Sequence, residues 1–181
     1  MLLLVAVSAF FITIFGMPNL IKVAKLKRRV DDPEDPRKIH HRSVPTIGGV
    51  IIYLVILTNG FFWLSLSEGP NHESFKQNSV LCACLTLVFS MGLKDDLIGM
   101  SASKKLIVHL FAGALLVTIG DFRIEGFGGL FGIEDMPETI STIFSLFVYI
   151  VIVNAWNLID GIDGLAGGYS AIAMAAFSAW F

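Results

Sequence analysis

Long apolar runs without any charge decide what this chain can fold into. The first run extends from Leu2 to Ile21, and about 20 such residues form an α-helix that crosses a bilayer. Hydrophobic residues make up 55% of the chain and charged residues only 15%, which is unlike a water-soluble domain. Further apolar runs cover residues 47–66, 80–93, 106–119, 140–158 and 169–181. We therefore predict an all-α, polytopic membrane protein with about five transmembrane helices and a truncated sixth.

The first apolar run is predicted to remain in the mature protein. A signal peptide normally opens with Lys or Arg, whereas no basic residue precedes Lys22. Pro18 is expected to bend this helix. The runs 80–93 and 106–119 are short for a span, which indicates a thinned or cavity-lined membrane, or helices longer than their apolar part. The last run is too short to cross, so we expect 1–181 to be a single membrane-embedded domain that is incomplete at its C-terminus.

The basic residues are distributed unevenly along the chain. Eight of the 13 lie in residues 22–42, and three more lie in residues 94–105. The positive-inside rule places both segments in the cytoplasm and the N-terminus outside. The alternation of spans then predicts a short outer loop over residues 67–79 and a small outer hairpin over residues 122–133, which are rich in glycine.

Four polar side chains, spaced three residues apart, follow one another at the end of the fifth apolar run. They are Asn154, Asn157, Asp160 and Asp163. A step of three residues falls about 60° short of a helical turn, so one straight helix cannot direct all four to one point. The glycines among them predict that the helix ends near Leu158 and that a tight polar loop follows. Carboxylates cost about 2.5–3.5 kcal/mol at membrane depth, so the loop indicates a bound cation or a water-filled mouth, with an ordinary hydrophilic loop as the alternative.

Two further polar segments fall on the same predicted side of the membrane. Asp95 and Asp96 follow the third apolar run, and adjacent side chains about 100° apart on a helix are suited to different roles. A hydrated helix cap is the alternative for this pair. Lys38, His40 and Arg42 precede a pair of glycines at the mouth of the second run. Such cations, with backbone amides that a ligand can approach closely, indicate a site for a phosphorylated ligand.

Carboxylates and basic side chains at a water interface together describe a site for a divalent cation and phosphate groups. Mg²⁺ is the favoured ion, with Mn²⁺ as the alternative, because hard cations take carboxylate and phosphate oxygens and the chain lacks the His and Cys pattern of zinc. In phosphoryl transfer such an ion bridges two phosphates and offsets the charge on the leaving oxygen. A lipid-borne phosphate can enter this site from the bilayer and meet a soluble nucleotide. Nucleic acid is not an expected partner.

Three motifs of this chain resemble those of the polyprenyl-phosphate N-acetylhexosamine-1-phosphate transferases, in the order of that family. They are RKIHHRSVPTIGG, GLKDDLIGMSASKKL and NAWNLIDGIDGLAGG. The family contains the membrane enzymes that start peptidoglycan lipid, O-antigen and teichoic-acid synthesis. In the first motif, Arg37, Lys38, His40 and Pro45 are closer to the N-acetylglucosamine-type branch than to the muramoyl-pentapeptide branch. The resemblance implies a multi-pass protein of the bacterial inner membrane with its active site at the cytoplasmic face.

The resemblance also implies a reaction and roles for individual residues. UDP-N-acetylhexosamine and undecaprenyl phosphate would give undecaprenyl-diphospho-sugar and UMP, with Mg²⁺. By motif position, Asp95 resembles the carboxylate that deprotonates the lipid phosphate, and Asp96 the second essential carboxylate. Asp160 completes the implied catalytic set, and Asp96 and Asp160 are the implied metal ligands. The implied substrate contacts are Asn157, Ile162, Asp163 and Lys105, to which we add Lys38, His40 and Arg42 as phosphate partners.

Several alternatives stay open at the level of sequence. Family members usually carry a later cytoplasmic aspartate that binds magnesium and a histidine-rich loop, and neither motif is present in these 181 residues. The chain is therefore expected to be an N-terminal part, which leaves open a noncatalytic fragment that needs a complementary chain. Half of an ion-coupled transporter is another reading, because carboxylates near membrane spans also mark carriers. A homodimer is one open arrangement, and the exact amino sugar and the pathway are undetermined.

Overall fold

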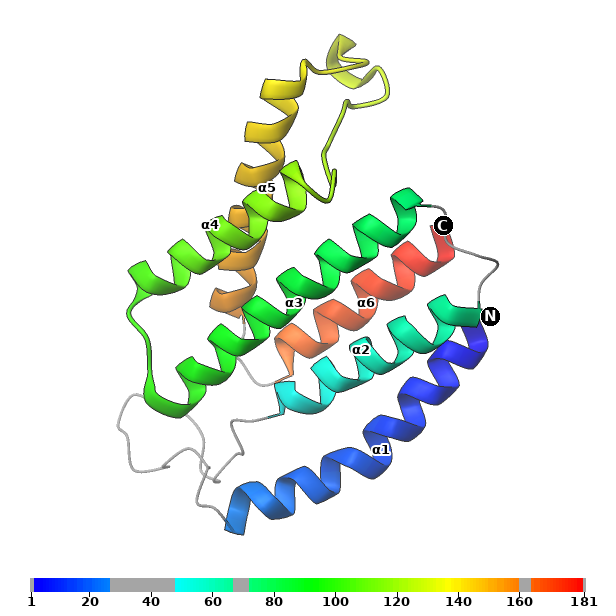
Figure 1. Cartoon of the computed structure of the whole chain (residues 1–181), viewed down its shortest axis with the longest axis vertical. Coiled ribbons are helices and arrows are strands. Elements are labelled where there is room, and N and C mark those ends of the chain that lie inside the picture. The colour runs from blue at the N-terminus through cyan, green and yellow to red at the C-terminus, as the bar shows by residue number, and fades with distance from the viewer. Residues whose placement is uncertain (1, 27–47, 67–71, 160–163, 181) are drawn as a thin grey trace. The chain divides into compact units, whose positions relative to one another are not determined.

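The computed structural model describes residues 2–26, 48–66, 72–159 and 164–180, and all regular elements in these residues are helical. The predicted all-α class is therefore confirmed. The chain divides into two compact units, Met1–Val108 and His109–Phe181. The helices labelled in Figure 1 are α1 (Leu2–Leu26), α2 (Gly49–Leu66), α3 (His72–Ile98), α4 (Ala102–Thr118), α5 (Glu138–Ile159) and α6 (Leu165–Trp180), and a short 3₁₀ turn covers Leu130–Gly132.

Most helices end close to the limits of their apolar runs, but α3 does not. α5 ends at Ile159, next to the predicted end at Leu158. α3 has 27 residues and continues past the apolar run in both directions, as a helix can because its backbone hydrogen bonds are internal. Glu73 lies in the first turn of α3, where a negative side chain stabilises the helix by interacting with the partial positive charge of its N-terminus. The predicted outer loop over 67–79 is therefore wrong from His72 onward.

Two of the described helices are long and apolar enough to cross a membrane. These segments are Leu3–Leu26, with 24 residues, and Glu138–Ile159, with 22 residues. Shorter apolar helices cover Gly49–Trp63 and Leu165–Trp180. α1 bends along its length (Figure 1), as predicted, because Pro18 lies inside it and removes one backbone donor.

In the first unit, α1 and α2 are joined by a polar cluster and a small-residue contact. Ser8 Oγ donates to Asn59 Oδ1 at 2.5 Å, and Trp63 Nε1 donates to these same two oxygens at 3.3 and 3.2 Å. A Cβ atom on Gly16 would lie 3.0 Å from Ile51 Cδ1, so the glycine lets the two helices approach closely. The cluster satisfies polar groups that would be costly in hydrocarbon.

α2 also packs against α3 in this unit. The rings of Tyr53 and Phe89 are stacked, with centroids 3.9 Å apart, and the Tyr53 hydroxyl lies 2.9 Å from Thr86 Oγ1 in a hydrogen bond. These contacts fix how far α2 and α3 are shifted along each other. As a result, the start of α2 lies beside the end of α3.

In the second unit, α4 and α5 approach each other at Gly113. A Cβ atom on this residue would lie 2.6 Å from Tyr149 Cδ1 and 2.8 Å from Leu146 Cδ1. Both distances are shorter than ordinary carbon contacts. α4 and α5 can therefore pack this closely only because Gly113 has no side chain.

The segment before α5 is fastened to that helix by two buried serines. The Ile124 N–H donates to Ser145 Oγ at 2.7 Å, and Ser141 Oγ donates to the Ile124 carbonyl at 2.8 Å. The chain reverses through the 3₁₀ turn, where the Gly129 N–H donates to the Ile133 carbonyl at 3.1 Å. Residues 122–133, all within the described part, thus form a hairpin-like loop without β-strands.

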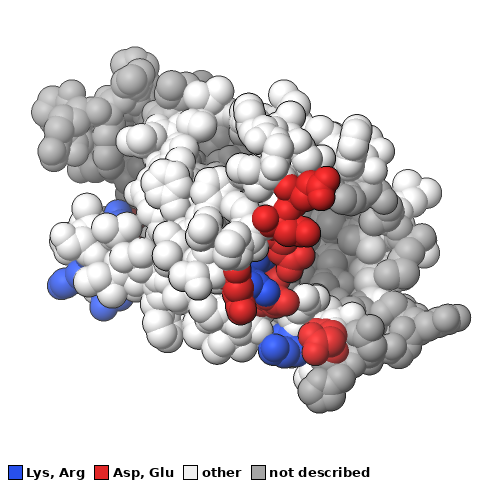
Figure 2. All heavy atoms as spheres, turned by 90° about the horizontal axis from the view of Figure 1, so that it is seen from above, with Lys and Arg blue, Asp and Glu red and all other residues white. Residues whose placement is uncertain are grey.

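An acidic surface borders this loop. Arg123 Nε lies 2.6 Å from Asp121 Oδ1, and Arg123 Nη1 lies 3.5 Å from Glu138 Oε1. The hydrogen bond to Asp121 raises the pKa of Arg123, so the guanidinium stays charged. Arg123, Glu125, Asp135 and Glu138 line a cavity of about 250 Å³. Figure 2 shows acidic side chains gathered on the face seen from above, with basic side chains beside them.

Candidate active site

The turn between α3 and α4 is built around Asp95. Its backbone carbonyl accepts the Gly99 N–H at 2.8 Å, and Gly99 has a φ of 73°, which glycine adopts without steric cost. Asp95 Oδ1 accepts the Met100 N–H at 2.8 Å. The Ser101 carbonyl then accepts the Lys105 N–H at 3.2 Å, within the first turn of α4. The motif GLKDDLIGMSASKKL therefore forms a helix end, a tight turn and a helix start.

Asp95 and Lys105 form an ion pair across this turn. Lys105 Nζ lies 2.5 Å from Asp95 Oδ2, and the two side chains are 35% and 27% exposed. Both oxygens of the Asp95 carboxylate thus have a partner, because Oδ1 already accepts the Met100 N–H. The carboxylate expected to take a proton also holds the turn together. Its Oδ2 is engaged by Lys105 while the side chain stays partly exposed.

Asp96 lies on a different side of α3, and its side chain is exposed. It lines a cavity of about 130 Å³, together with Gly92 and Leu93 of α3 and with Gly49 and Val50 at the start of α2. Gly49 of the first motif and Asp96 of the second motif are therefore neighbours. A helix start carries a partial positive charge, so this cavity combines a carboxylate with a backbone that favours anions.

The third motif is framed by contacts between α5 and α6. Asn157 lies exposed in the last turn of α5. Next to it, Trp156 Nε1 donates to Ser170 Oγ at 3.1 Å, and the Trp156 ring meets the Tyr169 ring edge to face at 5.2 Å. These contacts hold the end of α5 against the start of α6. Sequence reasoning did not select Trp156 or Ser170, although an indole N–H beside an apolar run signals that a partner is needed.

The predicted site residues fall partly inside and partly outside the described part of the chain. Asp95, Asp96 and Lys105 belong to the first unit, where they gather at the end of α3 and the start of α4, and Asn157 belongs to the second unit. The predicted residues that lie outside the described part of the chain are Lys38, His40, Arg42, Asp160, Ile162 and Asp163.

Mg²⁺ takes oxygen ligands, chiefly carboxylates and waters. Within residues 2–26, 48–66, 72–159 and 164–180, no three His, Cys, Asp or Glu side chains are grouped so that they could hold a metal ion. Each oxygen of the Asp95 carboxylate has one partner in the protein. Asp96 is an exposed carboxylate residue that lines a cavity, and carboxylate oxygens are ligands that a hard cation prefers. Asp96 therefore fits the ion as one ligand, and the second predicted ligand, Asp160, lies outside the described residues.

Two of the described helices are long and apolar enough to cross a membrane, and an ion pair of a carboxylate and a lysine lies between the end of α3 and the start of α4. The model of Glycosyl transferase family 4 matches residues 78–181, which is more than half of the chain. The chain belongs to this family of phospho-sugar-1-phosphate transferases, whose members are polytopic membrane proteins. The family resemblance read from the three motifs is thereby confirmed.

Three curated relatives are similar to this chain. The undecaprenyl-phosphate alpha-N-acetylglucosaminyl 1-phosphate transferase of Thermotoga maritima is 30% identical over 127 residues, covering 68% of this chain and 35% of the relative. The protein of the same name from Escherichia coli O157:H7 is 29% identical over 138 residues, which cover 74% of this chain and 35% of the relative. The phospho-N-acetylmuramoyl-pentapeptide-transferase of Chlamydia abortus is 28% identical over 141 residues, which cover 69% of this chain and 38% of the relative.

The matched region is a limited part of each relative. The alignments cover 35–38% of the length of these curated relatives. The chain therefore spans about a third of the length of the curated relatives it matches. No solved structure is a significant match for the chain.

Proposed function

We propose that the chain serves the transfer of N-acetylhexosamine 1-phosphate from a UDP-sugar to undecaprenyl phosphate, with release of UMP. This reaction would be the first membrane step of a cell-envelope polysaccharide. The observation that carries the proposal is the gathering of Asp95, Asp96 and Lys105 at the end of α3 and the start of α4, with Asp96 beside the start of α2, in a member of this family. N-acetylglucosamine is the preferred sugar because two of the relatives bear it in their names.

In the proposed reaction, an oxygen of the lipid phosphate attacks the sugar-linked phosphorus of the UDP-sugar. The bond from this phosphorus to the UMP oxygen breaks, and its electron pair leaves with UMP. Lys105 exchanges its ion pair with Asp95 for one with an incoming phosphate, because both partners are anionic and the phosphate carries the greater charge. Asp95 Oδ2 is then able to accept the proton of the lipid phosphate, while Oδ1 keeps the Met100 N–H.

Mg²⁺ is the proposed cofactor, with Mn²⁺ as a substitute, and the family generally depends on magnesium. Asp96 and Asp160 are the proposed ligands, and the ion would offset the charge on the diphosphate oxygens. Asn157, Ile162 and Asp163 are proposed to contact the substrates, by their place in the third motif. Lys38, His40 and Arg42 are proposed phosphate partners.

The proposed location is the bacterial inner membrane, with the site at the cytoplasmic face. The support is the distribution of charge, since 11 of the 13 basic residues lie in the two segments that include Lys105 and the proposed phosphate partners. Asp95 and Asp96 lie in the last turn of α3, near its end at Ile98. An ion-coupled carrier would instead place acidic residues in the middle of a span.

A second candidate is a noncatalytic part that assembles with a complementary chain. It is favoured by one observation, namely that the matched region covers only 35–38% of the relatives. In this case the reaction is the same, but the site is completed by residues of another chain. The two candidates differ in whether this chain is sufficient.

The test is UMP release from UDP-N-acetylglucosamine by membranes that contain the chain, undecaprenyl phosphate and Mg²⁺. Membranes without the chain are the background. We expect UMP that depends on the chain, either alone or after co-expression of the C-terminal part of a relative. Asp96→Asn should abolish it, and Asp135→Asn, in the hairpin-like loop, should not. Chelation by EDTA should stop the release and added Mg²⁺ should restore it. No chain-dependent UMP in either arrangement would contradict the proposal.

A further inference from the structure

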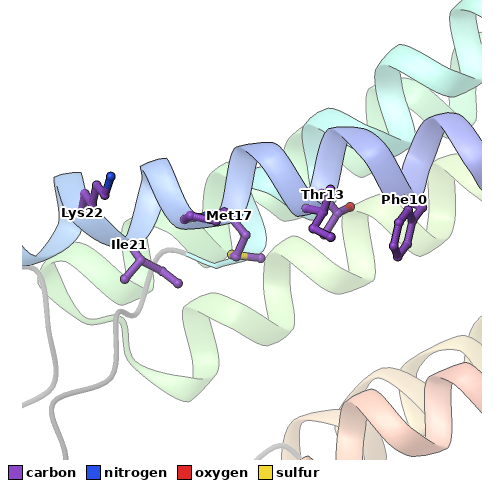
Figure 3. A pocket seen from close by; sticks show the side chains of 7 residues that line it. Phe10, Thr13, Met17, Ile21 and Lys22 are labelled. Atoms are coloured by element: carbon purple, nitrogen blue, oxygen red, sulfur yellow. The ribbon is translucent and has the colours of Figure 1, made fainter.

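A groove runs along one face of α1. It is lined by Phe10, Thr13, Ile14, Met17, Pro18, Ile21 and Lys22 and has a volume of about 560 Å³. Figure 3 shows the labelled side chains along the helix, with Phe10 at one end and Lys22 at the other. All the lining residues except Thr13 and Lys22 are apolar. The groove ends beside Lys22, whose side chain points to the other side of the helix from Met17 and Ile21 (Figure 3).

The groove opens away from α2. Contacts with α2 are made by Ser8 and Gly16, which lie about 170° and 110° round the helix from the line through Phe10 and Met17. Among the described elements, α2 is the helix that packs against α1. Phe10 is 61% exposed and Ile14 is 50% exposed. In a candidate membrane span, a face of this kind meets lipid.

The charge at the cationic end of the groove has one sign. Lys22 and Lys25 are exposed in the last two turns of α1, and the sequence continues with Lys27, Arg28 and Arg29. The first acidic residue of the chain is Asp31. A cluster of four to eight basic residues directly after a transmembrane helix is typical of binding to anionic lipid headgroups.

The length of the groove distinguishes one kind of lipid from another. Phe10 and Lys22 are 12 positions apart on the helix, which corresponds to about 18 Å. One leaflet of a bilayer core is about 15 Å thick. An acyl chain of an ordinary membrane lipid spans one leaflet and matches this length, whereas a long polyprenyl chain would extend beyond the groove.

We propose that this groove seats an acyl chain of an anionic glycerophospholipid, with the lipid phosphate at Lys22 and Lys25. The groove supplies the contact with the chain, and the lysines select the negative headgroup. Pro18 contributes to the trough, because the bend that it causes opens the helix surface beside it. This lipid site is separate from the proposed transferase chemistry and does not depend on it.

The experiment is native mass spectrometry of the purified chain in detergent with equal amounts of phosphatidylglycerol and phosphatidylcholine that carry the same acyl chains. We expect retention of one phosphatidylglycerol in preference to phosphatidylcholine. Lys22→Gln should lower this preference about fivefold. Met17→Trp should fill the groove and reduce retention of both lipids, while circular dichroism verifies that the helices persist.

Two matched variants serve as controls. Lys76→Gln removes the same charge from α3, and Leu4→Trp adds the same bulk to an exposed part of α1 outside the groove. Both should retain phosphatidylglycerol as the unchanged chain does. The proposal is overturned if the unchanged chain shows no preference, or if Lys22→Gln behaves as Lys76→Gln does. It is also overturned if undecaprenyl phosphate displaces phosphatidylglycerol at lower concentration, or if Met17→Trp abolishes a dimer while lipid retention persists.

Discussion

Asp95 and Lys105 are joined by an ion pair of 2.5 Å across the turn between α3 and α4. The same carboxylate accepts the Met100 N–H through its other oxygen. A residue expected to move a proton therefore also shapes the backbone around it. The structural role and the proposed proton transfer can be separated by experiment. The turn needs an oxygen that accepts the Met100 N–H, whereas proton transfer needs a carboxylate.

Asp95→Asn should remove activity while leaving the fold nearly intact. An asparagine oxygen can still accept the Met100 N–H, and only the partly exposed ion pair is lost, which costs about 0.2–1 kcal/mol. Thermal unfolding in detergent and UMP release measure the two effects, with Asp135→Asn as a matched control. Asp160→Asn is expected to abolish transfer in the same assay. Wild-type turnover in either variant would refute the assignment of these carboxylates.

Gly113→Ala should destabilise the packing of α4 on α5. The new methyl group would lie 2.6 Å from Tyr149 Cδ1, and overpacking of this kind costs about 1–3 kcal/mol. Gly60→Ala is the control, because no atom lies within 4 Å of a Cβ atom at Gly60. That change should be neutral or should stabilise α2 by up to about 1 kcal/mol through helix propensity. Equal effects of the two substitutions on the unfolding temperature would contradict the close contact at Gly113.

Ser8 and Asn59 should be energetically coupled. A double-mutant cycle with Ser8→Ala and Asn59→Ala is expected to give a coupling of about 0.6 to 1.7 kcal/mol, as for other hydrogen bonds between membrane helices. The coupling arises because Ser8 Oγ donates to Asn59 Oδ1 at 2.5 Å. Unfolding of the four proteins in mixed micelles measures it. Additive effects of the two substitutions would show that the cluster does not join α1 to α2.

Trp156 and Ser170 should be coupled in the same way at the third motif. Trp156→Phe keeps an aromatic ring for Tyr169 and removes the indole donor, and Ser170→Ala removes the acceptor. Each change is expected to lower the free energy of unfolding by about 0.5–1.5 kcal/mol, and the double variant should lose little more than one single variant. Ser170→Thr should retain the contact. A loss in the double variant equal to the sum of the two single losses would argue against this hydrogen bond.

The helical class of the protein and most of its helix limits could be predicted from sequence, because the length of a charge-free run is a local property. The end of α5 near Leu158 and the bend at Pro18 are examples. The extent of α3 could not be predicted in this way. Its first residues, from His72, are polar, and an apolar pattern does not indicate how far a helix continues into water.

The motifs by themselves determined the family and the choice of Asp95, Asp96 and Lys105 as site residues, since a motif preserves the order of chemical groups along the chain. Tertiary structure alone decided which of these groups meet. The stacking of Tyr53 on Phe89 brings Gly49 beside Asp96, and the turn at Gly99 brings Lys105 to Asp95. Contacts of this kind depend on how helices are shifted along one another and on how a turn closes, and neither is encoded in the spacing of residues within one segment.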